Sequence, residues 1–389
     1  MNKFKTLMIA YTVVIPGFLQ SQDSEQMKTK AFQVGLFTPL STNGLDSWNC
    51  NNNFSLNILG GYAGGVDGVE FSSLVSVLKT DMVGAQFTGL GNIVLRDLKG
   101  TQFSGLYNIV DGEVKAAQFA GLINVNCSKT KGFQASGLIN LSVDSLTGLQ
   151  VTGLLNYSKG FKATQISGLT NVNSVNLKGA QIAGLTNINA GRLSGVQIAG
   201  LFNYTKMLNG TQIGTINYVD SLESGVPIGF LSFVRHGYMS FEISSTETMY
   251  GVASFKTGIR QFYNILSVGW GYRDGMSLFG WGYGIGTLIP AGNKVDIGIE
   301  GLCYQVNEGE WFTNRLNLLN KLNFTVAWNV SRHFTLFVGP SWNVAVSDVW
   351  DEVGEPIEAH IAPWSVFDET TDNGYNIKMY PGFIAGVRF

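Results

Sequence analysis

A nine-residue motif, Gly-x-Gln-x-x-Gly-Leu-x-Asn, is written eight times between residues 84 and 203. Its first glycine is replaced only twice, by Ala116 and Ala163, and the step is 16 residues with a single step of 15. Spacing this strict is typical of one structural unit copied in tandem. The repeated amides are Gln86, Gln102, Gln118, Gln134, Gln150, Gln165, Gln181 and Gln197, and Asn92, Asn108, Asn124, Asn140, Asn156, Asn171, Asn187 and Asn203.

Each unit alternates with a period of two. Gln, a small residue, Leu and Asn share one parity, and the other parity is mostly Phe, Ile or Val. This alternation predicts a strand with one apolar face and one amide-bearing face. Pairs such as Asp111-Gly112, Asp144-Ser145 and Lys159-Gly160 suit tight hairpins between units. They leave about 11 to 14 residues per strand, near the length that crosses a bilayer at a tilt.

The composition limits the class of protein. Charged residues make up 13% of the 389 residues, whereas soluble proteins usually carry about 25%. The chain has no apolar run of 18 residues, which argues against a helical membrane protein and permits a barrel. A net charge of -2 argues against a nucleic-acid partner.

The N-terminus predicts export. Lys3 and Lys5 precede an apolar run over residues 7–19 and a polar stretch over residues 20–23, so we expect a signal peptide over residues 1–22. An uncleaved membrane anchor is the alternative. The three cysteines have no metal-binding spacing, and we interpret them as structural or incidental.

Long aromatic strands are expected after the repeats, at about 238–245, 250–258, 264–273, 277–289, 294–306, 318–331, 334–347 and 375–389. The final strand ends at Phe389, which resembles the C-terminal signature of bacterial outer-membrane β-barrels, where a terminal aromatic residue is read by the barrel-assembly machinery. Counted back from Phe389, the connections alternate long and short over four turns, as such barrels would have it.

The repeats resemble a family of bacterial surface-repeat proteins, which carry tandem Gly-x-Gln-x-x-Gly-Leu-x-Asn units after a secretion signal. The match is close over residues 84–203 and loose over residues 68–234. It implies a surface or outer-membrane location and no particular activity.

We therefore expect an all-β fold in which residues 23–389 form a single, large antiparallel transmembrane β-barrel of roughly 20 strands. Residues 68–234 would be repeat-built strands and residues 235–389 the aromatic C-terminal strands. The alternative is a barrel with a β-solenoid insert, in which identical Gln and Asn stack in ladders. Leu90, Leu106 and Leu122 share the inward parity of the amides, which suggests that the repeat wall packs against something.

Residues with site chemistry are few. His236 and His333 lie at expected turns, and His360 lies in an acidic external loop over residues 348–374. No nucleophile motif accompanies them, and the loop lacks the regular ligand spacing of a calcium site. We expect no catalytic, cofactor or metal residues. Trp350, Trp364 and Phe367 are the candidate partner contacts in that loop.

These observations predict a non-enzymatic outer-membrane protein that acts as a porin-like channel or a surface scaffold. The alternatives are a surface-exposed β-solenoid for binding or adhesion and, third, an outer-membrane hydrolase. The expected partners are outer-membrane lipid, the barrel-assembly machinery at Phe389 and a protein partner at the external loop. Neither a solute nor a partner can be named from the sequence.

Overall fold

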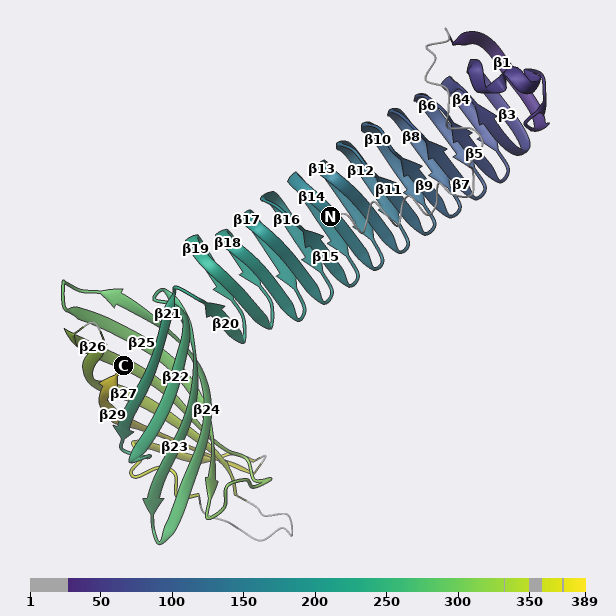
Figure 1. Ribbon diagram of the computed structural model, residues 1–389. Coiled ribbons are helices and arrows are strands. Elements are labelled where there is room, and N and C mark those ends of the chain that lie inside the picture. Colours follow the sequence, from purple (N-terminus) through teal and green to yellow (C-terminus); the bar gives the residue numbers. More distant parts are fainter. Residues whose placement is uncertain (1–26, 332, 350–358, 373) are drawn as a thin grey trace. The chain divides into compact units, whose positions relative to one another are not determined.

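A computed structural model describes residues 27–331, 333–349, 359–372 and 374–389 (Figure 1). The expected signal peptide and Trp350 lie outside these residues. The chain divides into two compact units: the first ends at Ser128 and the second begins at Lys129. We call them unit 1 and unit 2 and describe each by itself.

Unit 1 is a stack of short parallel strands, in which each turn of the chain lies on the one before it. Its elements are β1 (Lys28–Phe37), β2 (Leu40–Ser41), the 3-10 helix η1 (Gly44–Asn49), β3 (Cys50–Ala63), β4 (Gly65–Ser72), β5 (Val75–Leu78), β6 (Met82–Thr88), β7 (Gly91–Val94), β8 (Leu98–Ser104), β9 (Tyr107–Val110), β10 (Val114–Ala120) and β11 (Ile123–Asn126). β1 and β2 pair antiparallel; the other pairings are parallel, as in a β-solenoid.

Unit 2 begins with the same kind of stack. Its parallel strands are β12 (Thr130–Ser136), β13 (Ile139–Thr152), β14 (Leu155–Ser167), β15 (Thr170–Asn173), β16 (Leu177–Ala183), β17 (Thr186–Ala199), β18 (Phe202–Ile213), β19 (Ile216–Ile228) and β20 (Leu231–Val234). Equivalent residues of successive repeats are register partners: Gln165 pairs with Gln181, and Gln181 with Gln197.

The rest of unit 2 is an antiparallel sheet. It comprises β21 (Tyr238–Thr246), β22 (Gly251–Ile259), β23 (Phe262–Arg273), β24 (Met276–Pro290), β25 (Val295–Glu308), β26 (Asn317–Ser331), β27 (Phe334–Asp348), β28 (Phe367–Thr370) and β29 (Tyr375–Arg388). β29 pairs with both β27 and β21, so eight strands form a closed ring, and β28 adds only to β29. We call these eight strands the closed sheet.

From β6 to β11 each coil uses one strand of seven residues and one of four, as in β8 and β9. In β13, β14, β17, β18 and β19 the four-residue part of one coil continues into the strand of the next coil. The Gly-Leu pair of the motif is the corner between the two strands. A Cβ added to Gly105 would lie 2.0 Å from the carbonyl oxygen of Gly89 in the preceding coil. The glycine is therefore required because the backbones of successive coils approach too closely here for a side chain.

The interior of each stack combines apolar and amide side chains. In unit 1, Leu78, Met82, Val94, Leu98, Val110 and Val114 belong to one buried cluster. In unit 2, Leu146, Leu177, Leu193, Leu208, Val219 and Val234 form another. The glutamines and asparagines of the motif are fully buried between these rows.

The last coil of unit 2 packs on the closed sheet. The backbone N–H of Ser232 donates to the Asn264 side chain (3.0 Å), and Asn264 donates to the carbonyl of Gly229 (2.8 Å). Ile259 joins the buried cluster of the coils, and Phe262 packs against it. The closed sheet thus covers the final edge of the stack, where an unpaired strand would otherwise invite aggregation.

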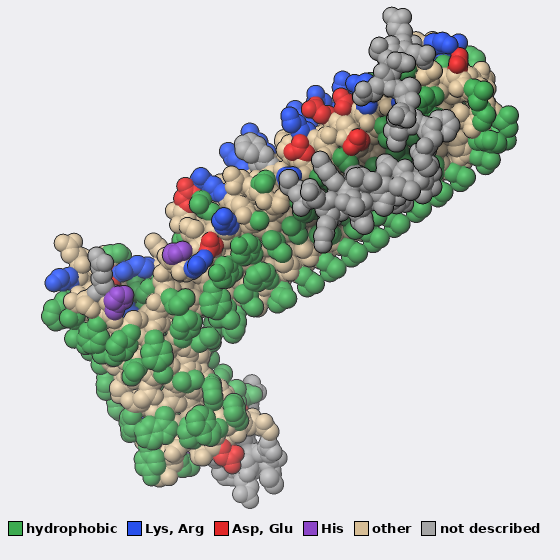
Figure 2. All heavy atoms as spheres, viewed as in Figure 1, with side chains coloured by type: hydrophobic (Ala, Val, Ile, Leu, Met, Phe, Trp, Pro, Cys, Tyr) green, Lys and Arg blue, Asp and Glu red, His purple; other side chains and the backbone are tan. Residues whose placement is uncertain are grey.

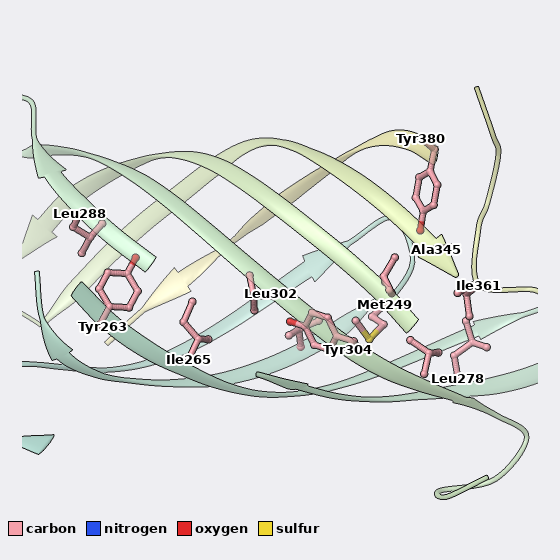
Figure 3. Close-up of a cluster of buried hydrophobic side chains, with 13 residues drawn as sticks. Met249, Tyr263, Ile265, Leu278, Leu288, Leu302, Tyr304, Ala345, Ile361 and Tyr380 are labelled. Atoms are coloured by element: carbon pink, nitrogen blue, oxygen red, sulfur yellow. The ribbon is translucent and has the colours of Figure 1, made fainter. Parts of the chain in front are cut away.

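The interior of the closed sheet is filled by side chains. A buried cluster includes Met249, Tyr263, Ile265, Leu302 and Tyr304 (Figure 3). Beside it, four ionised groups form one network: Lys256 contacts Glu242 and Glu300 at 2.5 Å, and Arg388 contacts Glu242 at 2.8 Å. A second buried pair joins Lys321 and Glu247 at 2.6 Å.

The expected large antiparallel barrel is wrong. Gln86, Gln102 and Gln118 stand in parallel register, so the repeats are coils of a solenoid and not barrel strands. The solenoid also precedes the closed sheet instead of interrupting it, which corrects the alternative of a solenoid insert. The porin-like channel fails with the barrel, because the Gln and Asn side chains fill the interior of the coils and line no lumen.

The expected hairpins are wrong for a related reason. Asp144-Ser145 and Lys159-Gly160 lie inside the continuous strands β13 and β14, where the register shifts by a bulge. A bulge bends a strand without reversing it, and it uses many of the residue types that hairpins use. Asp111-Gly112 lies at a corner between β9 and β10.

Candidate binding surface

A ladder of glutamines runs through each stack. In unit 1, Gln102 Nε2 donates to Gln86 Oε1 at 2.8 Å and Gln118 Nε2 to Gln102 at 2.9 Å. In unit 2, the same bond joins Gln150 to Gln134, Gln165 to Gln150, Gln181 to Gln165, Gln197 to Gln181 and Gln212 to Gln197. Every donor points to the preceding coil. Repetition of one amide therefore satisfies each buried glutamine with its own copy.

The motif asparagines form a second ladder of opposite direction. Asn92 Nδ2 donates to Asn108 and Asn108 to Asn124, each in the following coil. In unit 2, Asn140, Asn156, Asn171 and Asn187 continue the pattern as far as Asn217. Most of these asparagines also donate to a backbone carbonyl of the following coil, as Asn171 does to Ile182 at 2.8 Å. The asparagines thus tie each coil to the one that follows it.

The glutamine ladder of unit 1 ends on a buried carboxyl. Glu70 occupies the glutamine position of β4 and accepts from Gln86 (2.7 Å), Ser76 (2.7 Å) and Asn57 (3.0 Å). Burial raises the pKa of Glu70, and the hydrogen bonds from Ser76, Gln86, Ser55 and Asn57 oppose that rise. In unit 2 the ladder ends at Gln212, because its register partner Pro227 has no amide to donate.

In each unit, one edge of the coils is apolar and accessible to solvent. It surrounds the Gly-Leu corner and is built by the outward positions of the motif (Figure 2). In unit 1 it comprises Phe71, Phe87, Phe103, Phe119, Leu74, Leu90, Leu106, Leu122, Ile93, Ile109 and Val125; in unit 2, Val151, Ile166, Ile182, Ile198, Ile213, Ile228, Leu138, Leu154, Leu169, Leu185, Leu201, Leu141, Tyr157, Val172, Ile188, Tyr204 and Tyr218. We call this surface the apolar edge.

Identical side chains stack along the apolar edge. The rings of Phe71, Phe87, Phe103 and Phe119 lie 4.8 to 5.1 Å apart and nearly parallel. Leu106 and Leu122 stand at the corner, 38% and 39% exposed. The expectation that the leucines share the inward face of the amides is therefore wrong, because the corner between the two strands interrupts the alternation.

Charged residues gather at the opposite corner of each coil (Figure 2). In unit 1 they include Lys79, Asp81, Arg96, Asp97, Lys99, Asp111, Glu113 and Lys115; in unit 2, Lys129, Lys131, Asp144, Lys159, Lys178, Arg192, Lys206, Asp220 and Glu223. Some form surface ion pairs, such as Arg192 with Glu223 at 2.7 Å. We call this the charged edge. Each coil is therefore amphipathic across its section, with charge on one side only.

The described part of the expected external loop does not stand free. Trp364 donates from its ring nitrogen to the carbonyl of Pro381 at 3.0 Å, and Phe367 begins β28, which pairs with β29. Ile361 is buried in the interior of the closed sheet, and Arg273 holds its carbonyl at 2.8 Å. The two aromatic residues are part of the antiparallel structure, half exposed on its surface.

Phe389 lies where the ring of strands closes. Its backbone N–H donates to the carbonyl of Phe241 at 2.8 Å, and its carbonyl accepts from Phe241 N–H at 3.2 Å. Ser240 adds a side-chain bond to the same carbonyl at 3.0 Å. The C-terminal residue thus extends the pairing of β29 with β21. Recognition of Phe389 by an assembly machinery stays a prediction.

The three histidines have different surroundings. His236 Nδ1 is 3.1 Å from the carbonyl of Asp220, and His360 Nδ1 is 3.4 Å from a carboxylate oxygen of Glu308. His333 is at the turn between β26 and β27. Within the described ranges, no group of three His, Cys, Asp or Glu could hold a metal ion.

Two features of the coils were missed by sequence reasoning. The first is the role of Glu70, although its position sixteen residues before Gln86 was a usable signal. The second is another polar row in unit 2, two positions after the motif asparagine. Asn173 donates to Asn189 at 2.7 Å, and Asn189 to Thr205 at 3.0 Å. Their polarity at that fixed offset was visible in the sequence.

In the part of the chain that the structure covers, no helix has both the length and the apolar character needed to span a membrane. No protein-family model matches the sequence, and neither a curated protein nor a solved structure matches it. The geometry of the coils and of the closed sheet therefore carries the functional argument.

Proposed function

We propose that this chain is a non-enzymatic binding scaffold of the bacterial cell envelope, in which the apolar edge of the solenoid is the contact surface. The observation that carries the proposal is the segregation of charge in each coil. Every residue that defines the apolar edge is uncharged, and most are hydrophobic and exposed by a third or more. Continuous apolar surface of this kind is typical of interaction sites.

The coil interior supports the same role. Amide ladders and apolar rows hold successive coils in one register, so the side chains of the apolar edge are presented at a fixed spacing of about 4.8 Å. A partner that binds one coil meets the same chemistry in the next. Repetition of a weak contact along a rigid array raises the overall affinity.

Location is the second part of the proposal. The resemblance to bacterial surface-repeat proteins supports the cell envelope, and the expected signal peptide supports export. Outer-membrane location, adhesion and the lack of enzymatic activity all belong to the proposal. The scattered histidines favour a binding role over the hydrolase, because a hydrolase would need a histidine beside its nucleophile.

Site-specific photocrosslinking in cells tests this function. A benzophenone amino acid replaces Leu106 on the apolar edge or, as the matched control, Lys99 on the charged edge of the same coil. We expect discrete adducts of higher mass from position 106 and few from position 99. Equal labelling at the two positions, or no adduct at position 106, would contradict the apolar edge as the contact surface.

A further inference from the structure

The closed sheet has an unusual distribution of polarity, separate from that of the coils. Six ionised side chains lie in its interior: Glu242, Glu247, Lys256, Glu300, Lys321 and Arg388, each at most 7% exposed. A protein in water normally keeps such groups at its surface, because burial of an ion is costly. Here the ions are paired and turned inward.

The outward positions of the same strands show the opposite character. They include Met239, Phe241, Ile243, Leu266, Val268, Trp270, Ile285, Ile297, Leu322, Phe324, Val326, Trp328, Leu336, Val338, Trp342 and Phe383, which are 37% to 59% exposed. None of them carries a charge. We call this surface the outer belt.

We infer that the outer belt is a lipid-contacting surface and that the closed sheet anchors the chain in the hydrocarbon of a bilayer. A protein in water has polar side chains outside and apolar side chains inside, and a protein in lipid requires the reverse. Apolar side chains then face the hydrocarbon, and charged groups are kept away from it. This anchor is the eight-stranded sheet of residues 238–389. It involves neither the repeats nor a channel.

The backbone meets the same requirement. In hydrocarbon no water can satisfy an unpaired N–H or C=O group, so only helices and closed sheets cross. The eight strands are hydrogen-bonded around the full ring, and β29 joins β21 to complete it. The strands have 9 to 15 residues, and about 9 to 11 residues cross a bilayer at a tilt.

Lipid fits the outer belt better than a protein partner does. The belt residues come from seven of the eight strands of the ring, all except β22, which lies between β21 and β23. A surface that binds a protein partner would be apolar on one side of the ring only, and the other sides, in contact with water, would be polar. Fluid hydrocarbon can surround the sheet and contact it on nearly all sides, and it requires no charged groups on the protein surface.

Aromatic residues gather toward one end of the strands. Phe279 and Trp311 stack at 4.4 Å, and Trp281 and Phe312 at 5.3 Å. Trp281 also donates from its ring nitrogen to the carbonyl of Trp311 at 3.2 Å. Aromatic rings with polar tips are enriched where hydrocarbon meets water, so this cluster marks one boundary of the lipid-contacting region.

An outward groove of about 420 Å³ lies between β24, β25, β26 and β27. Tyr283, Ile285, Leu322 and Trp342 line it, and a Cβ added to Gly301 at its floor would meet nothing within 4 Å. A flexible apolar chain suits such a groove, and acyl chains are the most abundant ligands of that chemistry in a bilayer.

The test is a charge placed on the outer belt. Val326 and Val338 are register partners on β26 and β27 and are 54% and 59% exposed. On a surface in water, Val326→Arg or Val338→Arg would have little effect. In hydrocarbon, each should lower the fraction of full-length chain that inserts into phosphatidylcholine–phosphatidylglycerol vesicles by roughly tenfold or more. Insertion is measured by flotation with the vesicles and by heat-modifiable gel mobility.

Two controls separate a lipid effect from a folding defect. Ser331→Arg adds the same charge at the exposed end of β26, and Thr147→Arg adds it to the coils beside Lys131, its register partner on the charged edge; both should insert like wild type. Quenching of tryptophan fluorescence by brominated lipid should report contact directly. Wild-type protein that remains in the aqueous phase, or arginine variants at positions 326 and 338 that insert normally, would overturn the inference.

This test is independent of the proposed binding function. Failure of vesicle insertion would leave photocrosslinking at Leu106 unaffected, and failure of crosslinking would leave insertion unaffected. The two results can therefore be assigned separately to the apolar edge and the outer belt.

Discussion

The coils and the closed sheet solve the same problem, buried polarity, by different means. In the coils, neutral amides bond to copies of themselves, as Gln181 does to Gln165 and Gln197. In the closed sheet, unlike charges from distant strands meet, as Lys256 does with Glu242 and Glu300. A ladder can be extended one coil at a time, whereas an ion-pair network requires all its members at once. Repetition therefore suits the solenoid and unique sequence suits the ring.

The largest effect is expected from breaking the ion-pair network. Lys256→Met removes the cation that lies between the buried carboxylates of Glu242 and Glu300. Glu300 then retains Tyr263 and the more distant Arg388 (3.5 Å) as partners. Loss of one partner of a buried pair typically costs about 3–5 kcal/mol. We expect a matching drop in the urea midpoint of the detergent-folded protein. Lys178→Met, on the surface of a coil, is the control, and equal midpoints for the two variants would refute the argument.

A corner substitution tests the close approach of the coils. Gly105→Ala places a methyl group 2.0 Å from the Gly89 carbonyl oxygen, and overpacking against backbone should cost about 3 kcal/mol. Faster hydrogen–deuterium exchange of the peptides around residues 84–126 would report it. In the closed sheet, Gly301→Ala has open space around the new methyl group, so its exchange should match that of wild type. A neutral Gly105→Ala would show that the corner can relax.

An interruption of a ladder should have a smaller effect. Gln181→Leu leaves Gln165 Oε1 without its donor and removes the acceptor of Gln197 Nε2, which retains the carbonyl of Tyr204 at 3.1 Å. One buried group left unpaired costs about 2 kcal/mol. Exchange of amides in residues 165–203 should accelerate, with little change in the closed sheet. Ile182→Ala, the outward neighbour, provides the comparison for loss of side-chain volume alone.

The smallest effect, and one that depends on pH, is expected at the end of the ladder. The raised pKa of Glu70 means that the folded chain binds the proton of this carboxyl more tightly than the unfolded chain does. The contribution of Glu70 to the free energy of unfolding is therefore greatest at low pH. It falls as pH rises from the ordinary carboxyl range through the raised pKa. Glu70→Gln places the usual ladder residue there and should remove this fall.

Stability of unit 1 between pH 4 and 8, followed by hydrogen exchange, measures the Glu70 effect. Glu113→Gln removes an exposed carboxyl from the charged edge and is the matched control. A profile for Glu70→Gln that still follows wild type would assign the pH dependence to other groups.

Sequence reasoning predicted the strands of the closed sheet closely. The eight expected strands correspond to β21 to β27 and β29, and each end agrees within two residues. Those strands alternate glycine or small polar residues with aromatic ones and are separated by recognisable turns. Within the repeats, the alternation separated the glutamines from the Phe and Ile positions, which do lie on opposite faces of a strand, but the barrel to which these faces were assigned is wrong.

Strand pairing in the repeats could not be predicted from alternation alone. A parallel coil and an antiparallel hairpin place Gln and Phe on opposite faces in the same way, and residues such as Asp144-Ser145 suit a bulge as well as a turn. The Gly-Leu corner was the missing information. It divides an apparent strand of about 11 to 14 residues into strands of seven and four, and it turns the leucines outward.

The even number of strands in the ring has a consequence for compartment. If the ring spans a bilayer, as inferred above, the chain crosses it eight times and returns to the side from which it started, so the last coil at β20 and the C-terminal Phe389 would emerge into the same space. Closed sheets of the outer-membrane type have short turns on the periplasmic side and longer connections on the extracellular side. The end of β26 at Ser331 and the start of β27 at Phe334 lie at the same end of the ring as Phe389, and residues 309–316 lie at the other end. An anchor inserted from the periplasm would therefore leave the last coil of unit 2, at β20, on the periplasmic side of the membrane.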